Sequence, residues 1–411
     1  MGEQRRPDDG AVGQLRERLA RYPADRYPVQ HATARFHLGV ALAAEGRTEE
    51  AAADLEAAAA LFRPDHLPAE HAKAVNALGA VRRMAGDLDG AAGAFADAAE
   101  AFARCALPLE EGAALYNLGL VERERGRPAV APLERARALL DPARVPAQAA
   151  AAARELGAAL LDAGRPDDAV APLQEAVTLA ERAGDHAGLG GAANVLGLAH
   201  LAAGRPEEAA TALEAAAAAH PRSIRPDGWA MAKANQALAL EAAGRPAHAR
   251  LAALQALAAP VVPPPVRTQA EAVAARLGAG PGALWDVLDT EPAERWPALV
   301  REDARRWAEA GAGRRAGECG AWIAGQLARP AAAGDGAAAL VAALVELPPA
   351  EMDALVTALA GALAALDPDT QQAAAGPLSR AIGRLAVPQL LRLKDAFEQA
   401  GAAAGLSVTS W

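Results

Sequence analysis

Two stretches forty residues apart decide the fold: LGAALLDAGRPDDAVAPLQEA at residues 156–176 and LGLAHLAAGRPEEAATALEAA at residues 196–216. In both, a leucine-glycine pair is followed by a short apolar run, a second glycine, an Arg-Pro pair and an alanine-rich segment. The second glycine recurs six times, at intervals of 40, 40, 38, 40 and 40 residues: Gly46, Gly86, Gly126, Gly164, Gly204 and Gly244. Marks at so constant a spacing predict tandem structural repeats of about 40 residues.

Other residues recur at fixed distances from these turn glycines. In the first five repeats a leucine-glycine pair ends seven residues upstream of the turn glycine, and in most repeats Ala, an apolar residue and Ala lie five, nine and twelve residues downstream. A proline lies eighteen residues upstream in every repeat but the fifth, which has His186: Pro28, Pro68, Pro108, Pro146 and Pro226. The interval of 38 reflects two residues missing after Pro128, and all later marks shift by the same two places.

Each recurring residue has a physical reason for its place. Proline suits the first turn of a helix, where its missing N–H costs nothing, and a glycine with positive φ ends a helix. Carboxylates after the Arg-Pro pair are favoured by the helix dipole. The downstream apolar residues recur at steps of three and four and form one stripe, which a single hairpin cannot bury but stacked hairpins can. The pattern therefore predicts stacked helical hairpins.

These residues together resemble the tetratricopeptide repeat, in a variety of 40 residues. The resemblance predicts an all-α fold: a right-handed superhelical solenoid of about six helical hairpins over residues 28–259, followed by a smaller helical C-terminal domain. It also implies that the first helices of the hairpins line an inner groove that binds a peptide or another protein.

The ends of the array are predicted from composition and from proline. Residues 1–27 form an N-terminal segment with a capping helix at 11–27, and residues 260–278 combine a proline-rich break with a closing helix at 266–277. Residues 279–411 lose the period but keep helical patterns, and the expected helices cover 293–310, 314–327, 337–347, 350–366, 370–385 and 389–400.

Tryptophan is concentrated in this last part, where four of the six tryptophans lie between residues 285 and 322. We expect these rings to fill a second helical core, because aromatic side chains bury large areas. The alternative is a docking surface or a homo-oligomer interface. The C-terminal residues 406–411 are a further candidate as a ligand for another protein's pocket.

Composition limits the function classes. The chain of 411 residues carries a formal net charge of −10, and an acidic chain argues against a nucleic-acid partner. The N-terminus is polar and no apolar run approaches the length of a membrane span, so we expect a soluble, cytoplasmic protein without a membrane partner. Cys105 and Cys319 are expected to be reduced and buried. Abundant Ala, Gly and Arg is typical of a high-GC bacterium.

No pattern of residues indicates catalysis or a cofactor. The chain has no His-Glu-x-x-His motif, phosphate-binding loop or nucleophile elbow, and its eight histidines do not have metal-ligand spacing. The stretch GLGGAA at 188–193 is expected inside a helix with no preceding strand, where small residues serve packing. We therefore predict a protein that is not an enzyme and needs no cofactor.

The resemblance indicates which positions of the first helices would face a partner. Arginine can hold a carboxylate through two parallel hydrogen bonds, and asparagine can both donate to and accept from a peptide main chain. One hypothesis is a basic, asparagine-bearing pocket for an acidic or C-terminal peptide in the second and third repeats; the alternative is an ordinary solvated helix face. The candidate partner-binding residues are Lys73, Asn76, Arg83, Tyr116, Asn117, Arg123, Arg154, Asn194 and Asn235.

These observations favour a binding scaffold, adaptor or assembly factor. The alternative is a peptide- or ligand-responsive regulator, in which the C-terminal helices provide the output. An enzyme with a site between the repeats and those helices finds no support in the residues.

Overall fold

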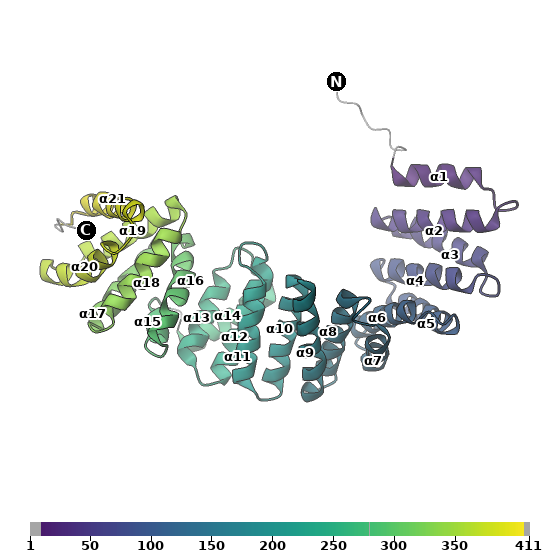
Figure 1. Ribbon diagram of the computed structural model, residues 1–411, viewed down its shortest axis with the longest axis horizontal. Coiled ribbons are helices and arrows are strands. Elements are labelled where there is room, and N and C mark those ends of the chain that lie inside the picture. Colours follow the sequence, from purple (N-terminus) through teal and green to yellow (C-terminus); the bar gives the residue numbers. More distant parts are fainter. Residues whose placement is uncertain (1–9, 279, 407–411) are drawn as a thin grey trace, which may run out of the picture. The chain divides into compact units, whose positions relative to one another are not determined.

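The computed structural model describes residues 10–278 and 280–406, and within them all regular structure is helical (Figure 1). The described residues fall into two compact units, one ending at Arg205 and one starting at Pro206. This confirms the predicted all-α class.

The first helix of every repeat begins at the predicted residue. All six are 17 residues long: α2 (Pro28–Ala44), α4 (Pro68–Met84), α6 (Pro108–Glu124), α8 (Pro146–Asp162), α10 (His186–Ala202) and α12 (Pro226–Ala242). In α10, which lacks the proline, the Asp185 side chain caps the helix by accepting a hydrogen bond from the Gly188 N–H. The six turn glycines have φ between 66° and 82°, a region that favours glycine.

The second helices of the repeats follow these turns: α3 (Thr48–Phe62), α5 (Leu88–Arg104), α7 (Val130–Leu139), α9 (Pro166–Ala183), α11 (Pro206–Ala219) and α13 (Pro246–Leu257). The shortest of them is α7, with 10 residues, and it lies in the repeat that lacks two residues after Pro128. The deletion therefore shortens one helix and leaves the hairpins on either side intact.

In the first unit, α2 packs on α3, α4 on α5, α6 on α7 and α8 on α9, and each second helix also packs on the next first helix. The preceding helix α1 (Ala11–Arg21) packs on α2, and its Val12 joins the core formed by Leu38 and Leu42. The helix ends before Pro23, earlier than the predicted residue 27, because proline cannot continue the hydrogen-bond ladder.

A close approach inside the hairpins of the first four repeats explains the leucine-glycine pair. A Cβ atom on Gly39 would lie 2.6 Å from Leu55 Cγ, and one on Gly79 would lie 2.9 Å from Phe95 Cε1. The same overlap would occur between Gly157 and the Leu173 side chain. Only glycine therefore lets the two helices reach this separation with a large apolar side chain between them.

In the second unit, α11 packs on α12, α12 on α13, and α14 (Pro264–Leu277) packs on both α13 and α12. The helix α14 therefore packs as the first helix of a further hairpin would. Its start lies two residues before the predicted position, because Pro264 and Pro265 are accommodated in its first turn.

The remaining helices follow a different packing rule. They are α15 (Ala283–Leu288), η1 (Ala293–Arg295), α16 (Trp296–Glu309), α17 (Ala312–Ala328), α18 (Ala333–Glu346), α19 (Pro349–Ala364), α20 (Pro368–Ile382) and α21 (Val387–Ala404). Here alternate helices form the main contacts: α16 with α18, α17 with α19, α18 with α20 and α19 with α21. The six predicted helices are present, and the six-residue α15 was not predicted.

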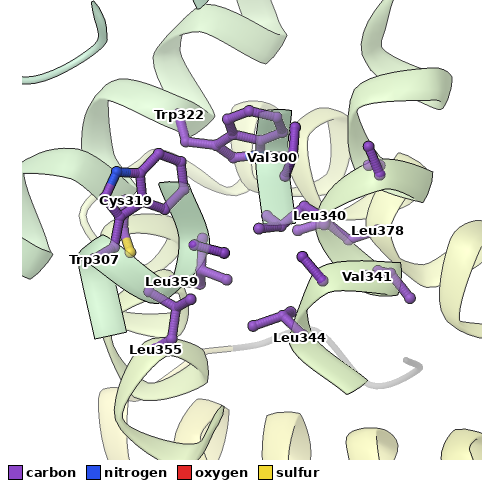
Figure 2. Packing of buried hydrophobic residues seen from close by; sticks show 14 of the residues in the cluster. Val300, Trp307, Cys319, Trp322, Leu340, Val341, Leu344, Leu355, Leu359 and Leu378 are labelled. Atoms are coloured by element: carbon purple, nitrogen blue, oxygen red, sulfur yellow. The ribbon is translucent and has the colours of Figure 1, made fainter. Parts of the chain in front are cut away.

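The tryptophans of this region form its core, as the sequence predicted. Trp285, Trp307 and Trp322 are at most 2% exposed, and Trp285 stacks on Trp322 with ring centroids 4.6 Å apart. Figure 2 shows Trp307 and Trp322 among the buried aliphatic side chains of this core. The alternative of a tryptophan docking or oligomer surface is wrong for these rings, because their area is already buried. Residues 407–411, the predicted terminal ligand, lie outside the described residues.

Within the described part of the chain, no helix is long and apolar enough to cross a membrane.

The two cysteines differ in environment. Cys319 is fully buried in the tryptophan core, and burial raises the pKa of its thiol to about 12. Cys105 is only half-buried, so the expectation of two buried thiols holds for one of them.

Because the thiolate is the reactive form, we predict that iodoacetamide at pH 8 alkylates Cys105 in the native protein and spares Cys319. Peptide mass mapping measures this, and in denaturant both residues should react.

We also predict that Gly157→Ala destabilises the protein by about 1–3 kcal/mol, because the added methyl group overlaps Leu173. The control is Gly93→Ala in α5, where a Cβ meets nothing within 4 Å. Alanine there should stabilise the helix by up to about 1 kcal/mol. Urea unfolding measures both, and equal effects from the two substitutions would contradict the packing explanation.

Candidate binding face

The first helices of the first unit contact one another in order, α2 with α4, α4 with α6, α6 with α8 and α8 with α10. Residues at one register on these helices therefore form a continuous row. The row that lies ten residues before each turn glycine is half-buried throughout and contains Phe36, Asn76, Tyr116, Arg154 and Asn194. We name the surface around this row the first-helix face.

Small residues lie beside this row. The register three residues upstream holds Ala113, Ala151 and Gly191 on α6, α8 and α10. A Cβ on Gly191 would lie 3.3 Å from Arg154 Nη1, so the Arg154 side chain extends from α8 towards α10. These small residues leave room for long side chains to lie across the face.

The three predicted arginines come together but are not free. Arg83 Nη2 donates to Glu124 Oε1 over 2.5 Å, and Arg123 Nε donates to Asp162 Oδ2 over 2.9 Å. Glu155 then accepts from both Arg123 and Arg154, at 2.6 and 2.9 Å. The predicted basic pocket is therefore a network in which every arginine already holds a carboxylate.

Two of these pairs obey one rule. Arg83 and Arg123 each lie three residues before a turn glycine, and their partners Glu124 and Asp162 lie two residues before the next turn glycine. Each arginine thus pairs with the following repeat. The sequence reading missed Glu124 and Asp162, although the signal was present: an acidic residue at the same register in two successive repeats.

Burial shapes the chemistry near this network. Removal from solvent raises the pKa of the Tyr116 phenol, and the nearby Glu155 carboxylate acts in the same direction. The hydrogen bonds to Glu124 raise the pKa of Arg83. Tyr116 is therefore a neutral phenol and the arginines stay charged, so the face offers neutral hydrogen-bonding groups beside balanced ion pairs.

Three other predicted residues remain available on the same face. Lys73 is exposed and has no ion pair among the described residues, and Asn117 is half-buried. The Oδ1 atom of Asn76 is buried and accepts no hydrogen bond from the described residues. An unpaired buried amide oxygen costs free energy, so it marks a position where a donor from a partner would be favoured.

The other two predicted asparagines lie apart from this group. Asn194 lies further along the same row, on α10. Asn235 belongs to the second unit and is only 7% exposed, and its Oδ1 accepts a hydrogen bond from Gln269 Nε2 of α14 over 2.9 Å. The closing helix thus uses the amide that the sequence reading assigned to a partner.

Towards α8 and α10 the first-helix face becomes apolar. On these two helices the registers six and three residues before the turn glycine hold the half-buried Leu161, Leu198 and Leu201. Polar groups on α4 and α6 thus lead into an apolar end on α8 and α10. A ligand that fits the whole face combines hydrogen-bonding groups with apolar side chains.

Among the described residues, no group of three or more His, Cys, Asp or Glu side chains is arranged to hold a metal ion.

The described chain contains a series of helical hairpins, and residues 148–222 match the tetratricopeptide repeat family. Several solved structures are similar. One contains the nearly identical TPR-like repeats of a Podosopora anserina kinesin light chain, at 20% identity and a TM-score of 0.41, covering 48% of this chain and 99% of that one.

The apo form of the quorum sensor NprR from B. thuringiensis is another, at 10% identity and a TM-score of 0.48, covering 78% of this chain and 87% of that one. A third is the Rap conjugation gene regulator of the plasmid pLS20 in complex with the Phr* peptide, at 14% identity and a TM-score of 0.37, covering 94% and 97%. No curated protein matches the sequence.

We predict that the ion pairs on this face differ in strength. Arg123 and Glu155 are largely shielded from solvent, whereas Arg83 and Glu124 are more exposed. Double-mutant cycles of urea unfolding should give a coupling of about 0.5–3 kcal/mol for Arg123→Met with Glu155→Gln. For Arg83→Met with Glu124→Gln we expect about 0.2–1 kcal/mol. The second coupling should fall further in 0.5 M salt, and the opposite order would contradict this ranking.

Proposed function

We propose that the first-helix face of the first unit binds a segment of another protein, and that the protein acts as a scaffold, adaptor or assembly factor. The observation that carries this proposal is the continuous half-buried row from Phe36 to Asn194, with the unpaired Asn76 oxygen within it. A buried amide oxygen without a donor favours a hydrogen bond from a partner at this position.

The chemistry of the face favours an extended peptide main chain. Asn76 and Asn117 supply an acceptor and donors for main-chain groups, and the Tyr116 ring offers area against which a side chain can pack. The leucines on α8 and α10 suit apolar side chains of the partner. Such a mixture of amides, an aromatic ring and apolar residues is typical of surfaces that hold peptides.

The arginine network alters the proposed preference for acidic segments. Arg83, Arg123 and Arg154 already hold Glu124, Asp162 and Glu155, so an incoming carboxylate would have to displace an internal one. Lys73 has no such competitor among the described residues. We therefore assign the recognition of a partner carboxylate, including a C-terminal one, to Lys73.

The test uses immobilised full-length protein and quantitative mass spectrometry of proteins captured from the native lysate. The variant combines Lys73→Ala, Asn76→Ala and Asn117→Ala, and it leaves the arginine network in place. We expect at least one protein captured by the wild type to be reduced tenfold or more by the variant. A photo-crosslinking amino acid at Tyr116 should then link to that same protein.

The matched control carries three substitutions on exposed positions of second helices: Asp97→Ala, Gln174→Ala and Glu181→Ala. Circular dichroism must show the same helix content in all three proteins. Capture that survives the first-helix variant, or that the control reduces equally, would show that the first-helix face is not the binding site.

A further inference from the structure

The C-terminal helices contain an apolar groove of about 720 Å³ between α17 and α19. On α17 its lining runs from Ala312 to Leu327, roughly 22 Å at 1.5 Å of rise per residue. Its walls consist mostly of alanine and glycine, including Ala316, Gly320 and Ala324 on α17 and Ala358 and Ala362 on α19. Walls of such small side chains let the backbone of a further helix approach closely. The groove therefore has the form of a helix-binding site.

The groove is open to solvent. Among its lining residues only Ile323 is buried, and all the others are half-buried or exposed. Its two walls already pack on each other, because α17 contacts α19. A helix that lay along the groove would therefore cover apolar surface without disturbing the core beneath it.

The charges beside the groove are mostly acidic. Arg315 points inward and donates hydrogen bonds to main-chain carbonyls at the end of α16, so Arg314 is the exposed cation at the start of α17. No lysine, arginine or histidine occurs between residues 330 and 379. Four carboxylates flank the α19 wall along the chain: Glu351 and Asp353 before it, and Asp367 and Asp369 after it. The α19 side of the groove thus favours a partner that carries cations.

The start of α21 has the opposite charge and exposes apolar side chains. Val387 and Leu391 lie one turn apart and are 69% and 53% exposed. Arg384 and Arg392 lie beside them, exposed and without an ion pair among the described residues. Residues 370–394 contain no aspartate or glutamate. We name Val387, Leu391, Arg384 and Arg392 together the basic ridge.

The basic ridge does not fill the groove of its own chain. The helix α21 packs on α19, and its buried side chains Leu393 and Phe397 belong to the tryptophan core. Val387 and Leu391 remain exposed in this arrangement. The ridge and the groove are therefore both free in a single copy.

We propose that the basic ridge of one copy docks in the groove between α17 and α19 of a second copy. The two apolar side chains enter between the small-residue walls, and the two arginines face the carboxylates that flank α19. Asp395, one turn beyond Leu391, is the matching charge for Arg314. A second copy is the occupant because the chain itself carries a helix with the apolar side chains and the cations that the groove selects.

Such a contact joins two different surfaces, so it is heterologous. Each added copy leaves one ridge and one groove free, and the copies join head to tail. Both surfaces belong to the second unit, which begins at Pro206, whereas the first-helix face belongs to the first. The inference goes beyond the proposed function, and self-association would present several first-helix faces in one assembly.

The test is sedimentation velocity of the full chain at concentrations up to about 200 µM. We expect the average mass to rise with concentration through dimers and trimers. The flanking charges are exposed, so changing from 50 mM to 0.5 M NaCl should raise the dissociation constant about threefold or more. A wild-type chain that stays monomeric at the highest concentration would overturn the proposal.

Two variants separate the two surfaces. The ridge variant combines Val387→Ser with Leu391→Ser, and the groove variant combines Ala316→Arg with Ala324→Arg, all at exposed positions. Each should raise the dissociation constant for self-association about tenfold or more. Mixed in equal amounts, the two variants still share one intact ridge and one intact groove. The mixture should therefore form heterodimers and nothing larger, and a mixture that stays monomeric would overturn the proposal.

The matched controls make the same changes elsewhere on the surface. Ile224→Ser with Val261→Ser removes two exposed apolar side chains, and Ala53→Arg with Ala60→Arg adds two arginines to the exposed side of α3. Both controls should associate as the wild type does, and controls that weaken association equally would contradict the assignment. The Lys73, Asn76 and Asn117 variant should also self-associate fully, whereas the ridge and groove variants should still capture the protein partner. Failure of either proposal can thus be told from failure of the other.

Discussion

The hairpins of the first four repeats depend on a contact that only a glycine permits. In each of these four, the first helix approaches the second at a glycine, and a large side chain of the second helix occupies the space where a Cβ would be, as at Gly39 with Leu55 and Gly157 with Leu173. This contact sets the separation of the two helices. The stacking of neighbouring hairpins and the alignment of the first helices into one face both follow from that separation.

Much of the fold could be predicted because its signals are local. Prolines, turn glycines and apolar stripes mark the ends and buried sides of helices within a single repeat, so the six first helices begin at the expected residues. The helix α15 escaped prediction because six residues are too few to display a helical period. The alternate packing of α16 to α21 also escaped, because helix periodicity identifies a buried side but not the helix that covers it.

The candidate site could be predicted only in part. Counting positions from the turn glycine of each repeat identifies Asn76, Tyr116, Asn117 and Arg154 as neighbours on one face. Stacked repeats place residues at the same repeat position next to one another. This counting could not identify their partners. Glu124 and Glu155 pair with the arginines across helices, and α14 covers Asn235, since pairing depends on side-chain reach and on what packs alongside. The sequence therefore indicates which residues share a face, but it does not indicate which of their charged side chains are unpaired.

The pairing between repeats also bears on how such an array can grow. The third repeat carries Arg123, which reaches forward to Asp162, and Glu124, which receives Arg83 from behind. In a tandem copy of this repeat, Arg123 of the first copy would face Glu124 of the second copy, and the outer neighbours would keep their partners. Gene duplication could therefore lengthen the array by whole repeats without leaving an unmatched charge at the new junction, and its length is free to vary in evolution.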